Sequence, residues 1–253
     1  MKIQLLNKKE DLAAIHLLQK EIYHLDAEDS LPYHTLVTLF SSGCFIYKVN
    51  DGSKIIGFSI LILGTDKNHQ FLHLYMIGVL QSYQMKNIAF KLMEKQKAEA
   101  KARGIGLIKW SFNPYSCQLA NFYINKCKSK IGNSYRTDMY LKEPSNSLNA
   151  DRIISFIDFN QKNQSTKNNA IINSELIKLK SYIAIDTNTM CSEDIYLNSR
   201  WKLHIPPEKI KSNKKCTKIY RDVFSRLLKN YILVKFDAKD RLGVYYFCKL
   251  PLE

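Results

Sequence analysis

Glycine and proline are scarce in this sequence, with 9 and 6 residues among 253, while 45% of the residues are hydrophobic. That balance excludes a collagen-like or low-complexity chain and indicates a folded globular protein. Long hydrophobic runs are lacking as well. The best stretch, residues 55–64, has the length of a strand and is too short to cross a bilayer as a helix. We therefore expect no membrane-spanning segment.

Cysteines in metal-binding patterns are also lacking. The six cysteines, at positions 44, 117, 127, 191, 216 and 248, form no CxxC pair and no Cys/His cluster at zinc spacing. Residues 1–10 return to charge before the apolar region of a secretory signal forms. These observations predict reduced thiols, a cytoplasmic location and no bound metal.

Acidic residues are few, with 23 Asp and Glu against 38 Lys and Arg and a formal net charge of +15. Such a charge favours an anionic partner, but it does not choose between nucleic acid, phospholipid and a phosphorylated cofactor. Residues 86–103 carry six basic and two acidic side chains, and residues 200–221 carry eight basic side chains and one acidic side chain. A nucleic-acid-binding protein is therefore one hypothesis, although no recognised nucleic-acid motif accompanies these segments. Basic residues spread over a solvated surface are the plainer interpretation.

Hydrophobic periodicity predicts an α/β protein in two parts. Over residues 1–160 it predicts helices at 8–25, 33–40, 88–103 and 116–125. It predicts strands at 3–6, 44–49, 55–63, 71–80, 107–112, 134–140 and 152–159. Residues 161–175 are rich in polar side chains and predict a linker or exposed loop. Residues 176–253 are expected to form a smaller C-terminal α+β extension.

The most informative segment is residues 78–89, in which the end of a strand leads into a loop and then a helix. Unpaired N–H groups of a first helical turn converge on an anion, and the helix dipole favours negative charge there. The candidate phosphate-binding residues are Gly78, Val79, Gln84, Met85, Lys86, Asn87, Ile88, Ala89 and Lys91. A polar loop before a basic helix, with no ligand, is the alternative.

This loop resembles that of the Gcn5-related N-acetyltransferase (GNAT) superfamily, which reads [QR]xxGx[GA] and holds the pyrophosphate of an acyl-CoA. Gln84, Asn87 and Ala89 occupy its positions. Other segments resemble, in the same order, one branch of predicted acyltransferases: residues 18–22, His73, residues 110–114, Ala120, Phe122, residues 125–126 and 150–152, and more faintly 205–206 and 220–224. The resemblance implies a mixed, mostly antiparallel twisted sheet flanked by helices. It also implies acetyl-CoA or succinyl-CoA as co-substrate and direct N-acyl transfer to a small-molecule amine.

The branch's pattern is not kept throughout. Asn87 stands in place of a Gly, Tyr75 of a His, Asn113 of an Asp, Leu119 of an Asn and Lys128 of a Gly. Asn tolerates the left-handed conformation better than other non-Gly residues, but its side chain narrows a phosphate site. A degenerate acyltransferase fold that binds without catalysing is therefore a third hypothesis.

The resemblance also suggests roles for single residues. His73 is the candidate general base, because imidazole titrates near neutral pH, and strand alternation places Tyr75 on the same face. Tyr123 lies near the position where relatives use a Tyr to protonate the departing thiolate. Trp110, Asn113 and Arg152 are the candidate acceptor-binding residues, and the Arg fork suits a carboxylate such as that of an amino acid. A structural His73, core packing of Trp110, turn capping by Asn113 and an ion-paired Arg152 are the alternatives.

Overall fold

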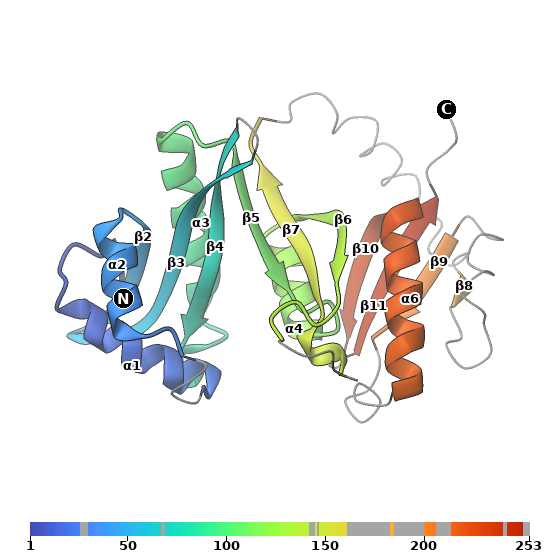
Figure 1. The fold of residues 1–253 in the computed structure, drawn as a ribbon, viewed down its shortest axis with the longest axis horizontal. Helices are drawn as coiled ribbons and strands as arrows, with labels where there is room; N and C mark the ends of the chain where they lie inside the picture. Colours follow the sequence, from blue (N-terminus) through green and yellow to red (C-terminus); the bar gives the residue numbers. More distant parts are fainter. Residues whose placement is uncertain are drawn as a thin grey trace. The chain divides into compact units, whose positions relative to one another are not determined.

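The computed structural model describes residues 1–25, 30–66, 69–141, 145, 147–160, 183–184, 200–205, 214–239 and 242–249. The chain forms two compact units (Figure 1). The first comprises Met1–Trp110 with Asp158–Asn160, and the second comprises Ser111–Ile157 with Gln161–Glu253. The expected linker, residues 161–175, lies outside the described residues, so the boundaries predicted around it stay predictions. Among the described residues, no helix is long and apolar enough to cross a membrane.

The first unit is a sheet with three helices. Its elements are β1 (Lys2–Leu5), α1 (Asp11–Tyr23), α2 (Tyr33–Ser41), β2 (Phe45–Asp51), β3 (Lys54–Asp66), β4 (His69–Val79), α3 (Ile88–Ala102) and the start of β5 (Leu107–Phe112). The strands follow the order β1-β2-β3-β4-β5, and all pairs are antiparallel except the parallel pair β4–β5. A tight turn joins β2 to β3, with Asp51 opposite Lys54 and Gly52 at φ +58°.

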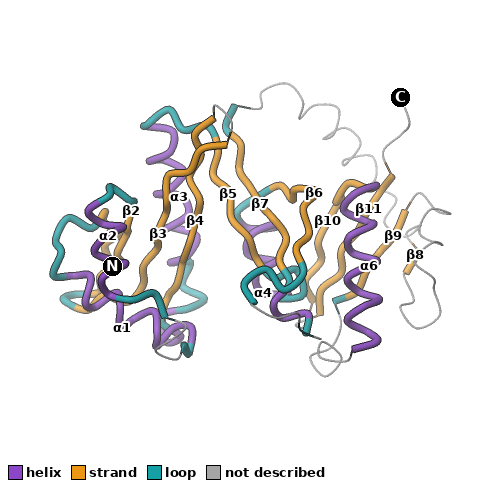
Figure 2. Tube along the Cα trace, viewed as in Figure 1, coloured by secondary structure: helices purple, strands orange, loops and turns teal. Residues whose placement is uncertain are grey.

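Helices α1 and α3 cover opposite faces of this sheet. The hydroxyl of Tyr47 on β2 donates to the Glu99 carboxylate of α3 at 3.3 Å, whereas the next residue, Lys48, pairs with Asp11 of α1. Successive side chains of a strand point to opposite faces, so the two helices lie on different sides. Figure 2 shows these helices beside the strands of the unit. The core between them contains the fully buried side chains of Phe58, Ile60, Leu61, Leu72 and Leu92.

The second unit combines a strand pair with a four-stranded sheet. It contains the end of β5, α4 (Cys117–Ala120) continued by a π turn (Asn121–Lys126), β6 (Lys130–Arg136), a 3-10 turn (Leu148–Ala150), β7 (Arg152–Asp158), β8 (Ile183–Ala184), β9 (Arg200–His204), α6 (Lys214–Asn230), β10 (Tyr231–Lys239) and β11 (Leu242–Lys249). Strands β6 and β7 are antiparallel, and the other sheet has the order β10-β11-β9-β8. Phe224 of α6 lies at the centre of an aromatic core, with ring centroids 5.2 Å from Tyr245 and 5.6 Å from Tyr115.

The element order through residue 160 confirms the predicted mixed, mostly antiparallel fold with flanking helices. One predicted strand is displaced. Residues 134–140 were expected to be extended, but β6 ends at Arg136, and Asp138 adopts φ +48° in a turn. The Asp138 carboxylate accepts hydrogen bonds from Ser145 and pairs with Arg221 at 2.8 Å. These side-chain contacts hold the turn, and a pattern of apolar residues does not reveal them.

Candidate functional site

The loop between β4 and α3 has the backbone that an anion site at a helix N-terminus needs. A 3-10 turn, Gln81–Tyr83, follows β4, and Met85 and Asn87 adopt left-handed conformations at φ +61° and +62°. The first i→i−4 hydrogen bond of α3 runs from the N–H of Lys91 to the carbonyl of Asn87 at 3.0 Å. The N–H groups of Ile88 and Ala89 therefore precede the helical ladder and lie at its N-terminus. The expected tolerance of Asn87 for positive φ is confirmed.

Side-chain contacts fix the first half of this loop. The Gln84 amide donates to the carbonyl of Val79 at 3.1 Å, which ties the loop back to the end of β4. The Tyr83 hydroxyl donates to Asp51 at 3.1 Å, and Lys86 lies with its ammonium 4.8 Å from the centroid of the Tyr83 ring. The side chain of Met85 is 95% exposed. The loop thus has an anchored start and a solvent-exposed tip.

Helix α1 contacts the end of β4 beside the loop. A Cβ added to Gly78 would lie 3.0 Å from a methyl carbon of Ile22, so this position keeps strand and helix close. The Tyr23 hydroxyl donates to the carbonyl of Ile77 at 2.6 Å, and burial raises the pKa of Tyr23 to about 12. A cavity of about 250 Å³ lies between the end of α1 and residues 80–84. Sequence reasoning missed Tyr23. Its position directly after the apolar residues at helical spacing in α1 was the feature that could have pointed to it.

Strand β4 is irregular next to His73. Met76 pairs with Ile60, and Leu74 pairs with Leu61, so the intervening Tyr75 has no partner on β3. This is a β-bulge, a feature common beside active sites because it redirects a side chain and its backbone N–H. Tyr75 is 47% exposed, and His73 is half-buried.

The ring of His73 lies in a basic environment. On the neighbouring strand β5, Lys109 is its register partner. Burial and the charge of Lys109 lower the pKa of His73 below its ordinary 6.5. The ammonium of Lys109 lies 3.4 Å from the Phe71 ring centroid and 3.8 Å from the Asp66 carboxylate. At pH 7 the imidazole is therefore neutral and able to accept a proton.

Two of the candidate residues have protein contacts in the second unit. Tyr123 is 6% exposed in the π turn, with its ring centroid 5.1 Å from that of Phe112. π turns often occur at functional sites. The side-chain oxygen of Asn113, Oδ1, accepts from the backbone N–H of Tyr115 at 2.7 Å, and its side-chain Nδ2 donates to the backbone carbonyls of Leu148 and Asn149. Asn113 thus holds the turn after β5. Trp110, at the end of the first unit, is 1% exposed.

Arg152 lies against an exposed aromatic ring. Its guanidinium carbon lies 5.4 Å from the centroid of Tyr140, whose hydroxyl is 2.6 Å from that of Ser111. One terminal nitrogen donates to the carbonyls of Asn149 and Asp151 at 2.7 and 2.8 Å. Within the described part of the chain, no side chain pairs with the other nitrogens of this guanidinium. Tyr140 and Ser111 were not found from the sequence.

The second unit also contains a buried ionic cluster that sequence reasoning missed. Arg221 of α6 donates to both oxygens of Asp151 at 2.9 and 2.7 Å, and to Asp138 at 2.8 Å. Asp151 is fully buried and also accepts a hydrogen bond from Tyr135. The resemblance had pointed to residues 150–152 and 220–224 separately, and the structure brings them together.

Comparison with known proteins identifies one domain and its fold. Residues 10–124 match the acetyltransferase (GNAT) family. The ribosomal-protein-S18-alanine N-acetyltransferase of Escherichia coli superposes with a TM-score of 0.52 at 16% identity, over 64% of this chain and 96% of that chain. A GNAT-family acetyltransferase of Streptococcus pneumoniae superposes with a TM-score of 0.51 at 14% identity, over 62% of this chain and 98% of that chain. Naa50 of Arabidopsis thaliana, in complex with the bisubstrate analogue CoA-Ac-MVNAL, superposes with a TM-score of 0.51 at 13% identity, over 62% of this chain and 98% of that chain.

A search of curated proteins gives no match. At these identities the solved structures establish the fold, and the sequence match establishes the domain. Among the described residues, no three His, Cys, Asp or Glu side chains are grouped as metal ligands would be. Residues 10–124 therefore form a domain that matches the acetyltransferase (GNAT) family, and the fold is that of solved GNAT acetyltransferases.

Proposed function

We propose that the protein transfers an acetyl or succinyl group from acyl-CoA to a small-molecule amine in the cytoplasm. The observation that carries the proposal is the loop of residues 84–89, with left-handed Met85 and Asn87 directly before the N-terminus of α3. Backbone N–H groups at this place suit a pyrophosphate. The GNAT domain match over residues 10–124 supports the same reading.

The residues present fit an acyl-CoA. Asn87 provides the left-handed turn that Gly provides in the family motif, because its φ is +62°. The N–H of Gln84 donates to the carbonyl of Gln81 at 3.1 Å, so the N–H groups of residues 85–89 would hold the phosphates. Lys86 and Lys91 would add positive charge that salt screens. The loop still differs from the family motif in the volume of the Asn87 side chain, since Gly has none. We expect this volume to lower the affinity for acyl-CoA without preventing binding.

The proposed reaction is direct attack of the amine on the thioester carbonyl. The new C–N bond forms as the C–S bond breaks, and the thiolate leaves. His73 takes the amine proton, directly or through a water, because its lowered pKa keeps it neutral at pH 7. Tyr123 is the proposed donor of a proton to the thiolate. Tyr75, on the bulge, is the proposed second polar group near the thioester.

For the acceptor we propose an amino acid. Arg152, with its guanidinium over Tyr140, offers to a carboxylate the nitrogens that do not donate to Asn149 and Asp151, and Ser111 provides a hydroxyl beside the ring. Trp110 and Asn113 are the proposed lining of the acceptor site. A peptide N-terminus is the other acceptor to test, since the Naa50 complex contains a peptide-like analogue.

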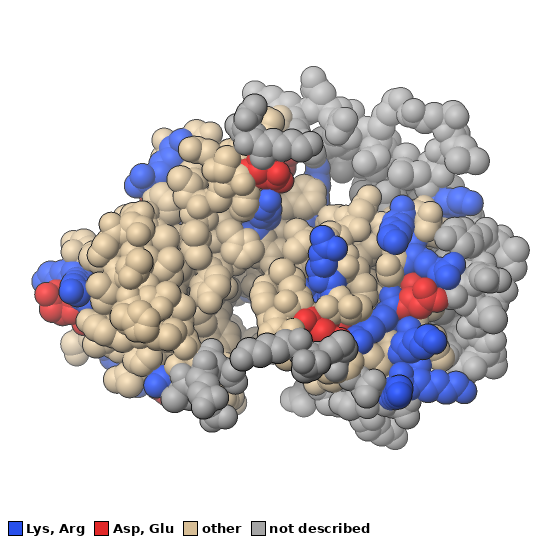
Figure 3. Space-filling view, in the orientation of Figure 1, with Lys and Arg blue, Asp and Glu red and all other residues tan. Residues whose placement is uncertain are grey.

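The test is a mass-spectrometric screen of amino acids, other small amines and peptides against acetyl-CoA and succinyl-CoA. A mass gain on an amino acid, lost in Arg152→Ala, supports the proposal, and acylation of peptides alone contradicts the acceptor. Basic side chains gather over α6 in Figure 3, which favours a nucleic acid as the second candidate partner. Retention on CoA-agarose, with and without competing DNA, separates a nucleic-acid binder from an acyl-CoA binder. Retention without turnover of any amine would identify a degenerate acyltransferase.

A further inference from the structure

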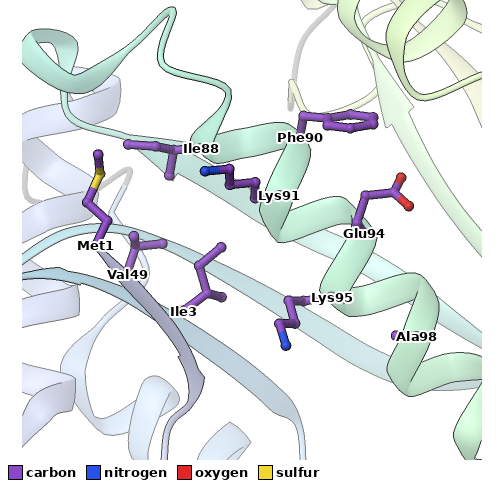
Figure 4. A pocket seen from close by; sticks show the side chains of 9 residues that line it. All are labelled: Met1, Ile3, Val49, Ile88, Phe90, Lys91, Glu94, Lys95 and Ala98. Carbon is purple, nitrogen blue, oxygen red and sulfur yellow. The ribbon is translucent and has the colours of Figure 1, made fainter.

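The first unit contains a groove between α3 and the edge strand β1, on the flank of the helix (Figure 4). Its volume is about 460 Å³, which is within the range of small-molecule sites. Met1, Ile3, Val49, Ile88 and Ala98 make most of its lining apolar. Such a surface is suited to a hydrocarbon or aromatic group.

The helix side of the groove carries positive charge. Lys91 and Lys95 are four residues apart and so lie on one face of α3, about 6 Å apart along the axis. Both are exposed, and among the described residues no carboxylate pairs with either. Glu94 is the acidic residue of the lining, and it pairs with Lys97 at 2.7 Å. In Figure 4 the Glu94 side chain leaves α3 away from Lys91 and Lys95.

We propose that this groove binds a small anionic amphiphile, of the class of free medium-chain or arylalkyl carboxylates. The apolar part would lie on Ile3, Val49 and Ala98, and the carboxylate would lie between Lys91 and Lys95. A neutral hydrocarbon would leave both ammonium groups without a partner, and a cationic amphiphile would be repelled by them. A nucleotide would place its polar sugar on the apolar lining, at a desolvation cost.

The test compares two ligands with the same tail and opposite charge. Calorimetry is carried out with dodecanoate and with dodecyltrimethylammonium, each below its micelle concentration. We expect dodecanoate to bind about tenfold more tightly, which corresponds to about 1.4 kcal/mol. Lys95→Glu should remove this preference. Lys54→Glu, the same charge change on an exposed residue at the β2–β3 turn, should keep it.

A second variant tests the groove without changing charge. Ala98→Trp places a large side chain in the groove from an exposed position of α3, so the fold should be kept and dodecanoate binding should be lost. Its melting temperature and CoA affinity serve as controls. Because dodecanoate binding is measured without CoA, failure of the proposed acyl transfer would not alter this result.

Three results would overturn the proposal. One is equal binding of the two amphiphiles, and another is the same response in Lys95→Glu and Lys54→Glu. The third is binding to phosphatidylglycerol vesicles that depends on Lys95 while free dodecanoate does not bind, which would assign the groove to a membrane surface.

Discussion

The loop of residues 84–89 in the first unit, the proposed phosphate site, and the Arg221 cluster of the second unit present polar groups in opposite ways. The loop offers backbone N–H groups at a helix end, and Met85 at its tip is 95% exposed. The cluster uses side chains, and its central carboxylate, Asp151, is fully buried. Backbone recognition at the surface depends on conformation more than on residue identity, whereas a buried ion pair depends on both partners.

This difference explains what each region tolerates. Asn87 replaces the family's Gly in the loop, and the turn survives because Asn reaches φ +62°. In the cluster, the guanidinium of Arg221 contacts two carboxylates and also the carbonyls of Ser145 and Ser147. No other side chain supplies that set of donors. Substitutions should therefore be severe in the cluster and graded in the loop.

The largest expected effect is that of Arg221→Met. It leaves Asp151 buried without its cation, and we expect a loss of about 3–5 kcal/mol in the free energy of unfolding. Arg226→Met is the matched control on the same helix, because Arg226 pairs with the half-exposed Asp222. Its loss should stay below about 1 kcal/mol. Urea unfolding at pH 7 measures both, and similar losses for the two variants would contradict a special role for Arg221.

The pH dependence of this loss follows from Asp138. Burial raises the pKa of its carboxyl, but hydrogen bonds from Ser145 and the pair with Arg221 outweigh burial and bring the pKa below 3.8. A carboxyl whose pKa is lower in the folded than in the unfolded protein stabilises the folded state at pH values above its unfolded pKa. This stabilisation is lost as the pH falls through the pKa of the folded state. The difference between wild type and Arg221→Met should therefore shrink below about pH 4. A difference that grows on acidification would contradict this account.

His73→Gln is expected to lower kcat/KM by about 10²- to 10⁴-fold, the usual contribution of a positioned base. CoA affinity should stay near the wild-type value, because His73 lies on β4 outside the loop of residues 84–89. The wild-type rate should fall on the acidic side with an inflection below pH 6.5, because burial and Lys109 lower the pKa of this imidazole. Initial rates over pH 5–9 test it. A variant that keeps the acidic limb would show that His73 is structural.

Sequence reasoning recovered the fold of the first 160 residues because hydrophobic periodicity reports local structure. It also located the loop before α3, since Gln84, Asn87 and Ala89 lie in one short segment. It missed the partners of Asp151 and His73. Arg221 is 70 residues from Asp151, and the Lys109–His73 pairing depends on the register of two parallel strands. Contacts of this kind are set by tertiary packing, which no local pattern contains.

Reversing the charge of lysines in or beside the loop of residues 84–89 should have a smaller effect than the substitutions of Arg221 and His73. Lys86→Glu together with Lys91→Glu should weaken CoA binding by about tenfold, since two exposed charges contribute about 1 kcal/mol or less each. The effect should diminish at high salt. Lys54→Glu reverses one charge outside the loop, so it is the control for each of the two single reversals, Lys86→Glu and Lys91→Glu, measured separately. Calorimetry at two ionic strengths measures it, and unchanged affinity with an unchanged salt dependence would remove both lysines from the site.

Asn87→Gly should tighten CoA binding by a few-fold, about 0.5–1 kcal/mol. Glycine adopts the left-handed conformation of Asn87 without strain, and it removes a side chain that we expect to narrow the proposed phosphate site. The measurement is CoA affinity together with the melting temperature. Asn87→Ala serves as the comparison, because it shortens the side chain but disfavours φ +62°. Weaker binding by a folded Gly variant would show that the Asn side chain contacts the ligand.

The smallest effect is expected from Lys109→Met, which sharpens the role of His73 without removing it. The substitution deletes the positive charge opposite the imidazole, so the pKa of His73 should rise. It should stay below 6.5, because burial is the larger cause of the lowering and remains. The chemical shift of the His73 ring protons, followed over pH 4–8, measures the change, with Lys54→Met as control. A pKa that does not move would mean that Lys109 is screened from His73 by Asp66, whose carboxylate lies 3.8 Å from its ammonium.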